Sequence, residues 1–449
     1  IADMSTGETS IYETYSAHDD NRYILDEIFR FIQSHSPKEM IIHTKNIDQI
    51  NWDEKSIRKS LEIRNEILHY NFYNSNQDIL KPAYIESLLS KVFPVTGAIT
   101  PIQYIGLDKN PTSLTSFIYL LQFAYEHNDN IISKLTKPVI WETEKHLILS
   151  HDSINQLNLV PNFNIKNSGI SSLWDILDKT KTPLGKRYLK YKLLNPIVDS
   201  IEINNTYDAV SEFQIKNDTQ YIFEGVSDQL KSINDIQRLH RKMALKKLHP
   251  YEFITLDNSY KKIKTIISYL KQASGNNNCK IIETELLKNN ELEELDSFMQ
   301  DYNQKIKMNE ILGVNLNNIT DSFFNKGVFK EIDEQQEKLE IFKSYFNLFS
   351  LSLGAIIDNS GKTKAEVKRS DKEDYFLTIT KSKSKILTGL IKKNPNKIVT
   401  FNSGKFSYKL SDLDLKNTTT QCKIFSGDIK QKSHLRVTYE NRVKNMCIK

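Results

Sequence analysis

Residues 171–213 carry the start and stop signals of three successive helices, and they constrain the fold more than any other part of the chain. Ser172 and the aspartate three residues later have the spacing of a capping box, which satisfies free amides at a helix start. Thr182 precedes a proline, which suits the first helical position because its missing N–H would be unpaired there. Pro196 ends this second helix, and Asp199 can cap the third.

The residues between these signals predict helices that pack against other parts of the chain. Ile203, Tyr207 and Val210 recur at helical spacing, which predicts a buried stripe along the third helix. The first helix should present a broad apolar face, which consists of Leu173, Trp174, Ile176 and Leu177. A packed helical layer is therefore expected in this region.

Length and composition limit the class of protein. A chain of 449 residues is expected to form about two to four domains. No stretch approaches the roughly 18 apolar residues of a membrane span, so we expect no membrane segment. Three widely separated cysteines, Cys279, Cys422 and Cys447, argue against a disulfide framework or a zinc site and favour a reducing, intracellular location. The chain begins with Ile1 and ends within a helical pattern, so we expect it to be an internal piece of a longer protein.

The first hundred residues alternate between strand and helix patterns. Runs of β-prone residues at 1–5 and 9–15 flank Thr6-Gly7, which is a hairpin signal. A helix is expected over residues 23–34 and a short buried strand over residues 40–43. This alternation predicts an α/β domain in which helices cover a sheet.

From about Pro111 the pattern is helical. Long helices are expected over residues 114–135, 250–272, 291–312 and 330–357, with a loop at residues 275–278. Apolar residues of the last helix have the spacing of a coiled-coil seam, at Ile332, Leu339, Phe342, Phe346 and Phe349. Such a stripe predicts packing against a neighbouring helix.

Between Gly361 and Leu410 the pattern changes to short β-prone runs, and positive charge is concentrated there. A small antiparallel sheet is expected, with strands over residues 366–368, 375–380, 397–401 and 405–410. This segment has thirteen lysine or arginine residues against four acidic ones, a net charge of +9 in a chain whose total is +5. A small, strongly basic module predicts a surface that binds phosphates. Ser426 and Asp428 then begin another helix, which should return toward the long ones.

Four sequence blocks closely resemble the MutS family of DNA mismatch-repair proteins. They are IADMSTGETSIYET at the start, LWDILDKTKTPLGKRYLKYKLLNP with its LDxTxTPxGxR pattern, INNTYDAVSEF, and INDIQRLHRKM. One departure is Asn205-Thr206, where the family usually has an arginine. The resemblance implies a multidomain, mainly α protein. Its parts would be a ribonuclease-H-like α/β connector at residues 1–110, an all-α core with long lever helices at 111–360, a small inserted antiparallel β clamp at 361–425, and the start of the returning lever helix at 426–449.

The resemblance also implies partners and cofactors. The clamp would contact double-stranded DNA, a second MutS-type subunit would complete a dimer, and a MutL-type protein would bind the connector. The core would link the clamp to the family's ATPase, which uses ATP and Mg²⁺ and would lie outside this chain. The family's mismatch-reading domain would also lie outside this chain. Because the ATPase is expected elsewhere, no catalytic, cofactor-binding or metal-binding residue is assigned within this chain.

Lysines of the basic segment are the candidate DNA contacts. Lysine carries a point charge without the planar geometry that reads base edges, so a lysine-rich surface should bind phosphates of any sequence. The principal candidates are Lys381, Lys383, Lys385, Lys392 and Lys393. Supporting contacts are expected from Lys362, Lys364, Lys368 and Arg369. The alternative for each of them is an ordinary solvated basic face.

Two further patterns resemble parts of catalytic sites. Gly361-Lys362-Thr363 ends like a phosphate-binding loop, but Ile356 replaces its first glycine and a helix precedes it, so we interpret it as a chance match. Asp3 is similar to the metal-binding aspartate of ribonuclease-H-like nucleases. The nearby carboxylates lack a nuclease spacing; they are Asp19, Asp20, Asp26 and Glu27. Two alternatives therefore stay open: a MutS paralogue with a structural or recombination role, and a Mg²⁺-dependent nuclease at the connector.

Overall fold

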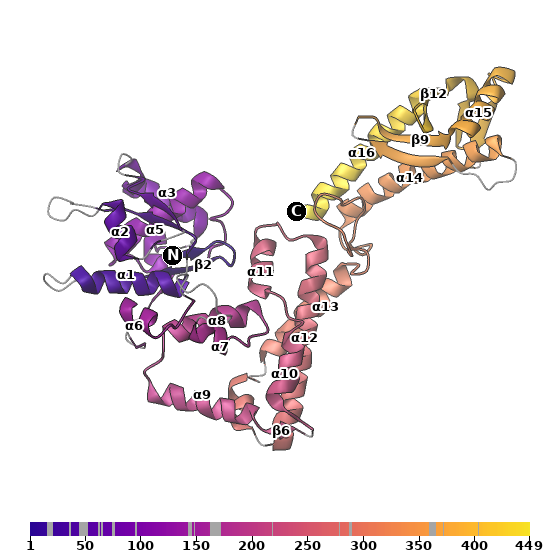
Figure 1. The fold of residues 1–449 in the computed structure, drawn as a ribbon. Helices are drawn as coiled ribbons and strands as arrows, with labels where there is room; N and C mark the ends of the chain where they lie inside the picture. The colour runs from indigo at the N-terminus through magenta and orange to yellow at the C-terminus, as the bar shows by residue number, and fades with distance from the viewer. Residues whose placement is uncertain are drawn as a thin grey trace. The chain divides into compact units, whose positions relative to one another are not determined.

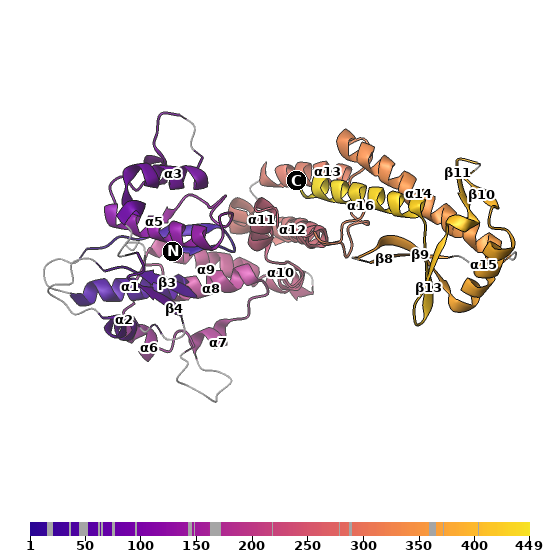
Figure 2. The ribbon, with the colours of Figure 1, turned by 90° about the horizontal axis from the view of Figure 1, so that it is seen from above.

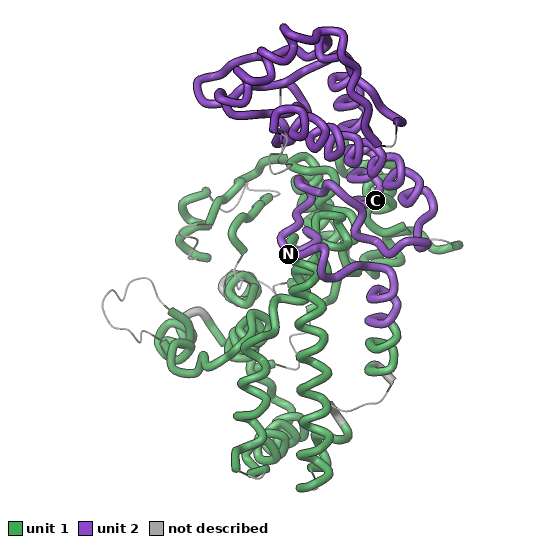
Figure 3. Tube along the Cα trace, turned by 90° about the vertical axis from the view of Figure 1, so that its right-hand side faces the viewer, with its two compact units in different colours: residues 1–248, 252–297 green, residues 249–251, 298–449 purple. Residues whose placement is uncertain are grey.

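The computed structural model of the protein describes most of the chain. It covers residues 1–15, 21–35, 37–44, 53–61, 63, 66–73, 77–94, 97–141, 146–147, 149–161, 172–217, 219–277, 279–286, 290–358, 365–370, 372–402 and 404–449. The chain divides into two compact units, which are residues 1–248 with 252–297 (unit 1) and residues 249–251 with 298–449 (unit 2) (Figure 3). Most of the regular structure is helical (Figure 1), which confirms the prediction of a mainly α protein.

Unit 1 contains the short strands that the sequence predicted near the N-terminus. Its strands are β1 (Ala2–Asp3), β2 (Glu8–Ile11), β3 (Glu39–Ile42), β4 (Ile67–Tyr70), β5 (Val139–Ile140), β6 (Lys216–Asn217) and β7 (Gln220–Tyr221). Strands β1 and β2 form the predicted hairpin, and Gly7 adopts a φ of 83° in its turn. Strand β5 pairs with β2 in parallel, and β3 pairs with β4 in parallel.

Helices make up the rest of unit 1. They are α1 (Asn21–His35), α2 (Glu54–Ser60), α3 (Pro82–Val92), α4 (Pro101–Ile105), α5 (Pro111–His127), α6 (His151–Gln156), α7 (Leu173–Leu177), α8 (Pro183–Leu194), α9 (Ser200–Phe213), α10 (Ile222–Leu230) and α11 (Ile236–Ala244). Helices α12 (Pro250–Asn277) and α13 (Asn290–Lys305) follow, although residues 250–251 of α12 and 298–305 of α13 belong to unit 2. None of the helices in the described ranges is both long and apolar enough to cross a membrane.

Helix α5 packs into the N-terminal hydrophobic cluster. Its residues Ile118 and Leu121 are buried together with Leu89 of α3 and Ile11 of β2. The sequence had placed the change to a helical core at residue 111, whereas this helix shares a core with the α/β part. A helical pattern shows which face of α5 is apolar, but it does not show which layer that face meets.

The helix signals of residues 172–213 are confirmed. The Ser172 hydroxyl accepts a hydrogen bond from the Asp175 amide at 3.2 Å, and the Thr182 hydroxyl accepts one from the Gly185 amide at 3.0 Å. Asp199 accepts one from the Ile201 amide at 2.8 Å. These side chains replace bonds that the first amides of a helix cannot form within it.

The buried stripe predicted for α9 is wrong. Helix α9 has no buried residue, and Tyr207 and Val210 are 65% and 49% exposed. In α7 only Trp174 is buried, while Leu173, Ile176 and Leu177 are exposed. The spacing identified an apolar face correctly, but no described segment covers it.

Three other predicted boundaries differ from the structure. Helix α5 ends at His127, before a turn in which the Asn128 side chain accepts a bond from a backbone amide two residues later. Helix α13 ends at Lys305, well before residue 312. The loop predicted at residues 275–278 is also wrong, because α12 continues through Asn277, and residue 278 lies outside the described ranges.

Two long antiparallel helices form the frame of unit 2. They are α14 (Lys330–Ile357) and α16 (Gly427–Ile448). Ile332, Leu339, Phe346 and Phe349 are buried, and Phe342 stacks on Tyr439 of α16 with ring centroids 5.6 Å apart. The predicted seam is therefore confirmed. The Ser426 hydroxyl accepts a bond from the Ile429 amide at 3.0 Å, so the returning helix begins where the sequence indicated.

Between these helices the chain forms a small β-rich module, as predicted, with one additional helix. The strands are β8 (Glu366–Ser370), β9 (Asp374–Thr380), β10 (Ile398–Phe401), β11 (Phe406–Lys409), β12 (Asp414–Asn417) and β13 (Gln421–Phe425). A four-stranded antiparallel sheet has the order β12-β13-β9-β8, and β10 and β11 form a separate hairpin. The additional helix is α15 (Lys381–Lys393). Figure 2 shows α15 and the β10–β11 hairpin gathered around the C-terminal end of α14.

Arg241 joins helix α11 to the segment after α5 and to the N-terminal hairpin inside unit 1, where its Nε lies 3.5 Å from the Met4 carbonyl oxygen. Its guanidinium is almost fully buried and donates to the carbonyls of Ile131, Ser133 and Lys134 at 2.7 to 2.9 Å. A side chain at Gly7 would place its Cβ 3.0 Å from Arg241 Cδ, so the hairpin turn also depends on having no side chain there. The planar fork of arginine can reach several carbonyls at once, which a single ammonium cannot.

We expect Arg241→Lys to lower the free energy of unfolding of unit 1 by about 2–3 kcal/mol, because most of these charge-assisted bonds would be lost. Guanidinium unfolding followed by tryptophan fluorescence measures this directly, since Trp141 and Trp174 lie in the described part of unit 1.

The matched control is Arg238→Lys in the same helix. Arg238 is 52% exposed and lies 3.4 Å from Asp235, so its replacement should change the unfolding free energy by less than about 0.5 kcal/mol. Equal unfolding midpoints for the two variants would show that the Arg241 contacts contribute little.

Candidate nucleic-acid interface

The basic module comprises the described residues between Ala365 and Phe425. Its interior is apolar and is completed by helix α14. Leu387 of α15, Phe401 of β10 and Ile424 of β13 are buried in one cluster with Phe349 and Leu353 of α14. The module therefore has no separate core, and its charged surface rests on side chains supplied by the long helix.

Helix α15 carries the five principal candidate lysines, whereas the sequence predicted only short strands in this module and no helix between residues 380 and 397. Leu387 and Ser384 are buried, while Lys381 and Lys385 are exposed one turn apart. The reason is the apolar spacing of Leu387, Leu390 and Ile391, which fits a helix lying on the module. The charge pattern identified the lysines. Their helix was not predicted, because the segment is short and lies between β-prone runs.

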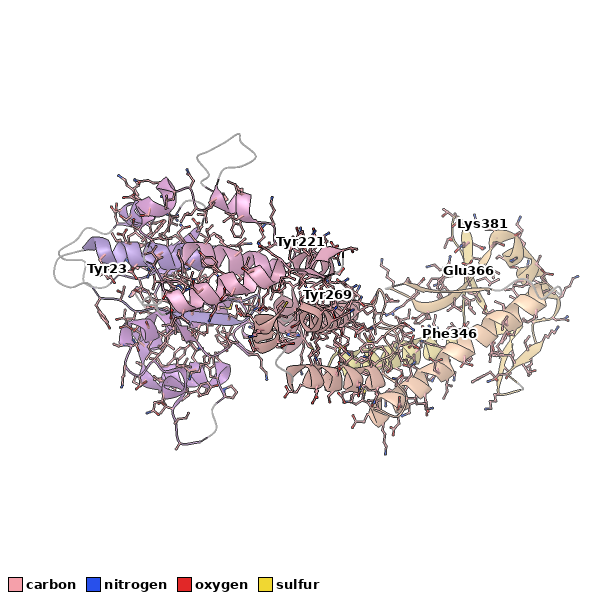
Figure 4. All side chains as sticks on the ribbon, turned by 90° about the horizontal axis from the view of Figure 1, so that it is seen from below. Tyr23, Tyr221, Tyr269, Phe346, Glu366 and Lys381 are labelled. Atoms are coloured by element: carbon pink, nitrogen blue, oxygen red, sulfur yellow. The ribbon has the colours of Figure 1, made fainter. Side chains whose placement is uncertain are left out.

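Three of these lysines share one flank of α15. Lys381, Lys385 and Lys392 fall within about 40° of one another around the helix axis, because successive residues are about 100° apart. Lys393 is also exposed, and Lys383 is partly buried. Figure 4 shows Lys381 projecting from the start of α15 at the margin of unit 2.

The charges of the α15 lysines are not neutralised by neighbours. None of the five forms an ion pair with another residue in the described part of the chain. Many other cations of unit 2 do form one; Lys423, for example, pairs with Glu373. The α15 lysines therefore retain positive charge that a polyanion can neutralise.

The supporting candidates have a different environment. Lys368 donates to the Gln421 amide oxygen at 2.9 Å and lies 3.1 Å from Glu366, which is labelled in Figure 4. Arg369 donates to Glu440 of α16 at 3.2 Å. Both side chains thus contribute to the packing of the module. Lys362 and Lys364 lie outside the described residues, as does the Gly361-Lys362-Thr363 pattern.

Five exposed lysines of the module were not named as contacts. Lys372, Lys397, Lys405 and Lys409 had been counted in the charge of residues 361–410, and Lys416 lies beyond that segment. Lys397 donates its amide to the Asn394 carbonyl at 3.2 Å, so the turn after α15 holds it close to Lys393. This turn was marked in the sequence by the Asn394-Pro395-Asn396 run.

The described carboxylates considered for a nuclease, which are Asp3, Asp26 and Glu27, belong to no group of three metal-ligating side chains. Asp3 accepts hydrogen bonds from the hydroxyl and the amide of Ser5 at 2.6 and 2.8 Å. Partial burial would raise the pKa of Asp3, but these bonds outweigh it and hold the pKa below its ordinary value. Glu27 pairs with Arg30 at 2.9 Å, and Asp19 and Asp20 lie outside the described residues. Among the residues with described positions, no group of three metal-ligating side chains was found.

Comparisons with known proteins agree on one family. The family model of MutS domain III matches residues 152–394. A putative DNA mismatch repair MutS homologue of Acanthamoeba polyphaga mimivirus is 32% identical over 86% of this chain and 36% of its own length. The DNA mismatch repair protein MutS of Clostridioides difficile is 26% identical over 85% of this chain and 36% of its own length. A mitochondrial mutS homologue of Sarcophyton glaucum is 32% identical over 40% of this chain and 17% of its own length.

The chain thus spans about a third of the length of the mimivirus and clostridial relatives, which cover most of it. The domain match covers more than half of the residues and includes both the capped helices of unit 1 and helix α15 of the basic module. On these grounds the chain belongs to the MutS family of DNA mismatch-repair proteins.

Proposed function

We propose that the basic module is a clamp that holds duplex DNA by its phosphates in a MutS-type mismatch-repair protein. The observation that carries this proposal is the set of lysines on α15, Lys381, Lys383, Lys385, Lys392 and Lys393, which have no acidic partner among the described residues. A duplex carries about one negative charge per 1.7 Å of its axis and releases counterions wherever a cation replaces them. A lysine without an acidic partner can replace these counterions, and their release favours binding.

The geometry of α15 suits a phosphate backbone. Lys381 and Lys385 are one helical turn apart, about 6 Å along the axis, and Lys392 lies about 10 Å further. Flexible lysine stems on one flank can follow a strand of phosphates over that distance. None of these side chains has the planar, bidentate form that reads guanine or adenine edges.

The family supplies the wider context of the proposal. We assign residues 1–110 to a connector, 111–360 to a core whose first helix, α5, packs on the connector, 361–425 to the clamp and 426–449 to the returning lever helix. The core would transmit changes between the clamp and an ATPase that uses ATP and Mg²⁺. A second MutS-type subunit and a MutL-type protein are the proposed protein partners, and the connector is the proposed contact for the latter.

Replacing the five α15 lysines with glutamine should reduce the salt dependence of duplex binding. Five phosphate contacts contribute about −4 to −5 to the slope of log affinity against log salt concentration, at about 0.9 per phosphate. Fluorescence anisotropy with a labelled duplex at several salt concentrations measures the slope. Binding by the variant should become weaker and much less sensitive to salt.

The matched control removes the same number of charges from unit 2 outside the module. It replaces Lys305, Lys307, Lys326, Lys330 and Lys338 with glutamine. This control should leave the slope within about one unit of the unmodified protein. A control slope that falls as far as that of the α15 variant would mean that net charge, and not the clamp, governs binding.

Binding should also be independent of base sequence. Contacts to phosphates carry no direct sequence information, so duplexes of equal length but different composition, including one with a single mismatch, should compete within about twofold. Competition anisotropy at fixed salt tests this. A preference of tenfold or more for the mismatched duplex would require base contacts that α15 cannot supply.

A further inference from the structure

A buried polar cluster connects the basic module to helix α16, and the proposed DNA contact does not use it. Its centre is Glu440, which is 3% exposed and accepts bonds from three side chains. Tyr375 of β9 donates its hydroxyl at 2.8 Å, Arg436 of α16 donates at 3.0 Å, and Arg369 of β8 donates at 3.2 Å. A carboxylate buried to this degree is costly unless its bonds are satisfied, so the cluster strongly favours one arrangement.

Aromatic contacts hold the same groups in place. The Arg436 guanidinium lies 3.6 Å from the centre of the Tyr375 ring, and Arg369 lies 5.5 Å from it. Arg436 also lies 5.6 Å from the ring of Phe346 in α14, which is labelled in Figure 4. The Tyr375 amide donates to the buried Ser433 hydroxyl at 2.7 Å. Ser433, Arg436 and Glu440 follow one face of α16, so the β8–β9 hairpin is fastened along two turns of that helix.

The contacts between the module and helix α14 have a different character. They are mainly aromatic, such as Phe349 against Tyr408 at 4.4 Å and Tyr345 against Phe406 at 5.1 Å. Two polar contacts accompany them: the Ser350 hydroxyl donates to the Ala365 carbonyl, and the Ser352 hydroxyl lies 3.5 Å from the Tyr408 hydroxyl. Apolar packing is non-directional and tolerates small sliding movements, whereas satisfied buried ion pairs and hydrogen bonds specify a register.

We propose that Glu440 is a positioning residue that fixes the β8–β9 hairpin to α16 in one register, so that α16 moves with the DNA-holding module. This inference rests on the proposed function, because the module must hold DNA for such a coupling to matter. It also assigns Arg369 to this cluster, in place of the DNA contact expected from the sequence. Packed helices joined in this way move as units between discrete arrangements.

The test is hydrogen–deuterium exchange of the 449-residue chain with and without duplex DNA. In the unmodified protein, DNA should slow exchange in α15 and also in residues 433–443 of α16. Glu440→Gln keeps the size of the side chain but leaves two guanidinium groups without their shared negative charge. The slowing in α15 should persist in this variant, while the DNA-dependent slowing in α16 should fall by about tenfold, within the usual range of coupling energies.

Two further variants keep the test decisive. Glu337→Gln makes the same charge change on α14, where Glu337 is 64% exposed and pairs only at the surface with Lys326, and it should leave both responses intact. If Glu440→Gln fails to fold, Tyr375→Phe removes the hydroxyl that lies within hydrogen-bond distance of both Glu440 oxygens, and it should weaken the α16 response while sparing that of α15.

The outcomes separate the inference from the proposed function. Loss of the DNA response in α15 of the unmodified protein would refute the clamp and the coupling together. A normal α15 response, with an α16 response that Glu440→Gln leaves unchanged, would refute the coupling alone.

Discussion

The structure of unit 2 depends on the burial of one aromatic stripe. Tyr345, Phe346, Phe349 and Leu353 of α14 are almost fully buried, and they fill the interior of a module that has no sufficient core of its own. Removing such a side chain from a packed core typically costs about 3–5 kcal/mol. The long helix is therefore both a support for the module and the larger part of its hydrophobic interior.

This dependence explains how a small segment can carry so much charge. A net charge of +9 between residues 361 and 410 produces self-repulsion that opposes compact folding. The α14 side chains provide apolar burial that offsets it, and the lysines remain on the outer surface of α15. Glu440 pairs with two further cations, Arg369 of the module and Arg436 of α16. Unit 2 thus has lysines on α15 that form no ion pair among the described residues, and arginines that share one buried carboxylate although Arg369 itself is 46% exposed.

Much of this fold could be predicted from the sequence where the relevant signals are local. The capping residues Ser172, Thr182 and Asp199 act on amides two or three positions away, so their spacing was sufficient. The packing seam of α14 could be predicted as well, because its apolar residues recur at a helical period along the whole helix. The candidate lysines were found by charge, but their helix was missed, since α15 is short and lies between β-prone runs. The pairing of Arg369 with Glu440 could not be predicted, because the two residues are 71 positions apart in the sequence.

The sequence alone determined where the capped helices begin, which helix faces are apolar, and where positive charge is concentrated. These properties follow from interactions between residues close together in the chain. Only the tertiary structure decided which apolar faces are covered: α14 buries its stripe, whereas Tyr207 and Val210 of α9 remain exposed. It also decided which cations are neutralised and which remain available. Burial and pairing depend on segments distant in sequence, and one sequence without its fold does not specify those partners.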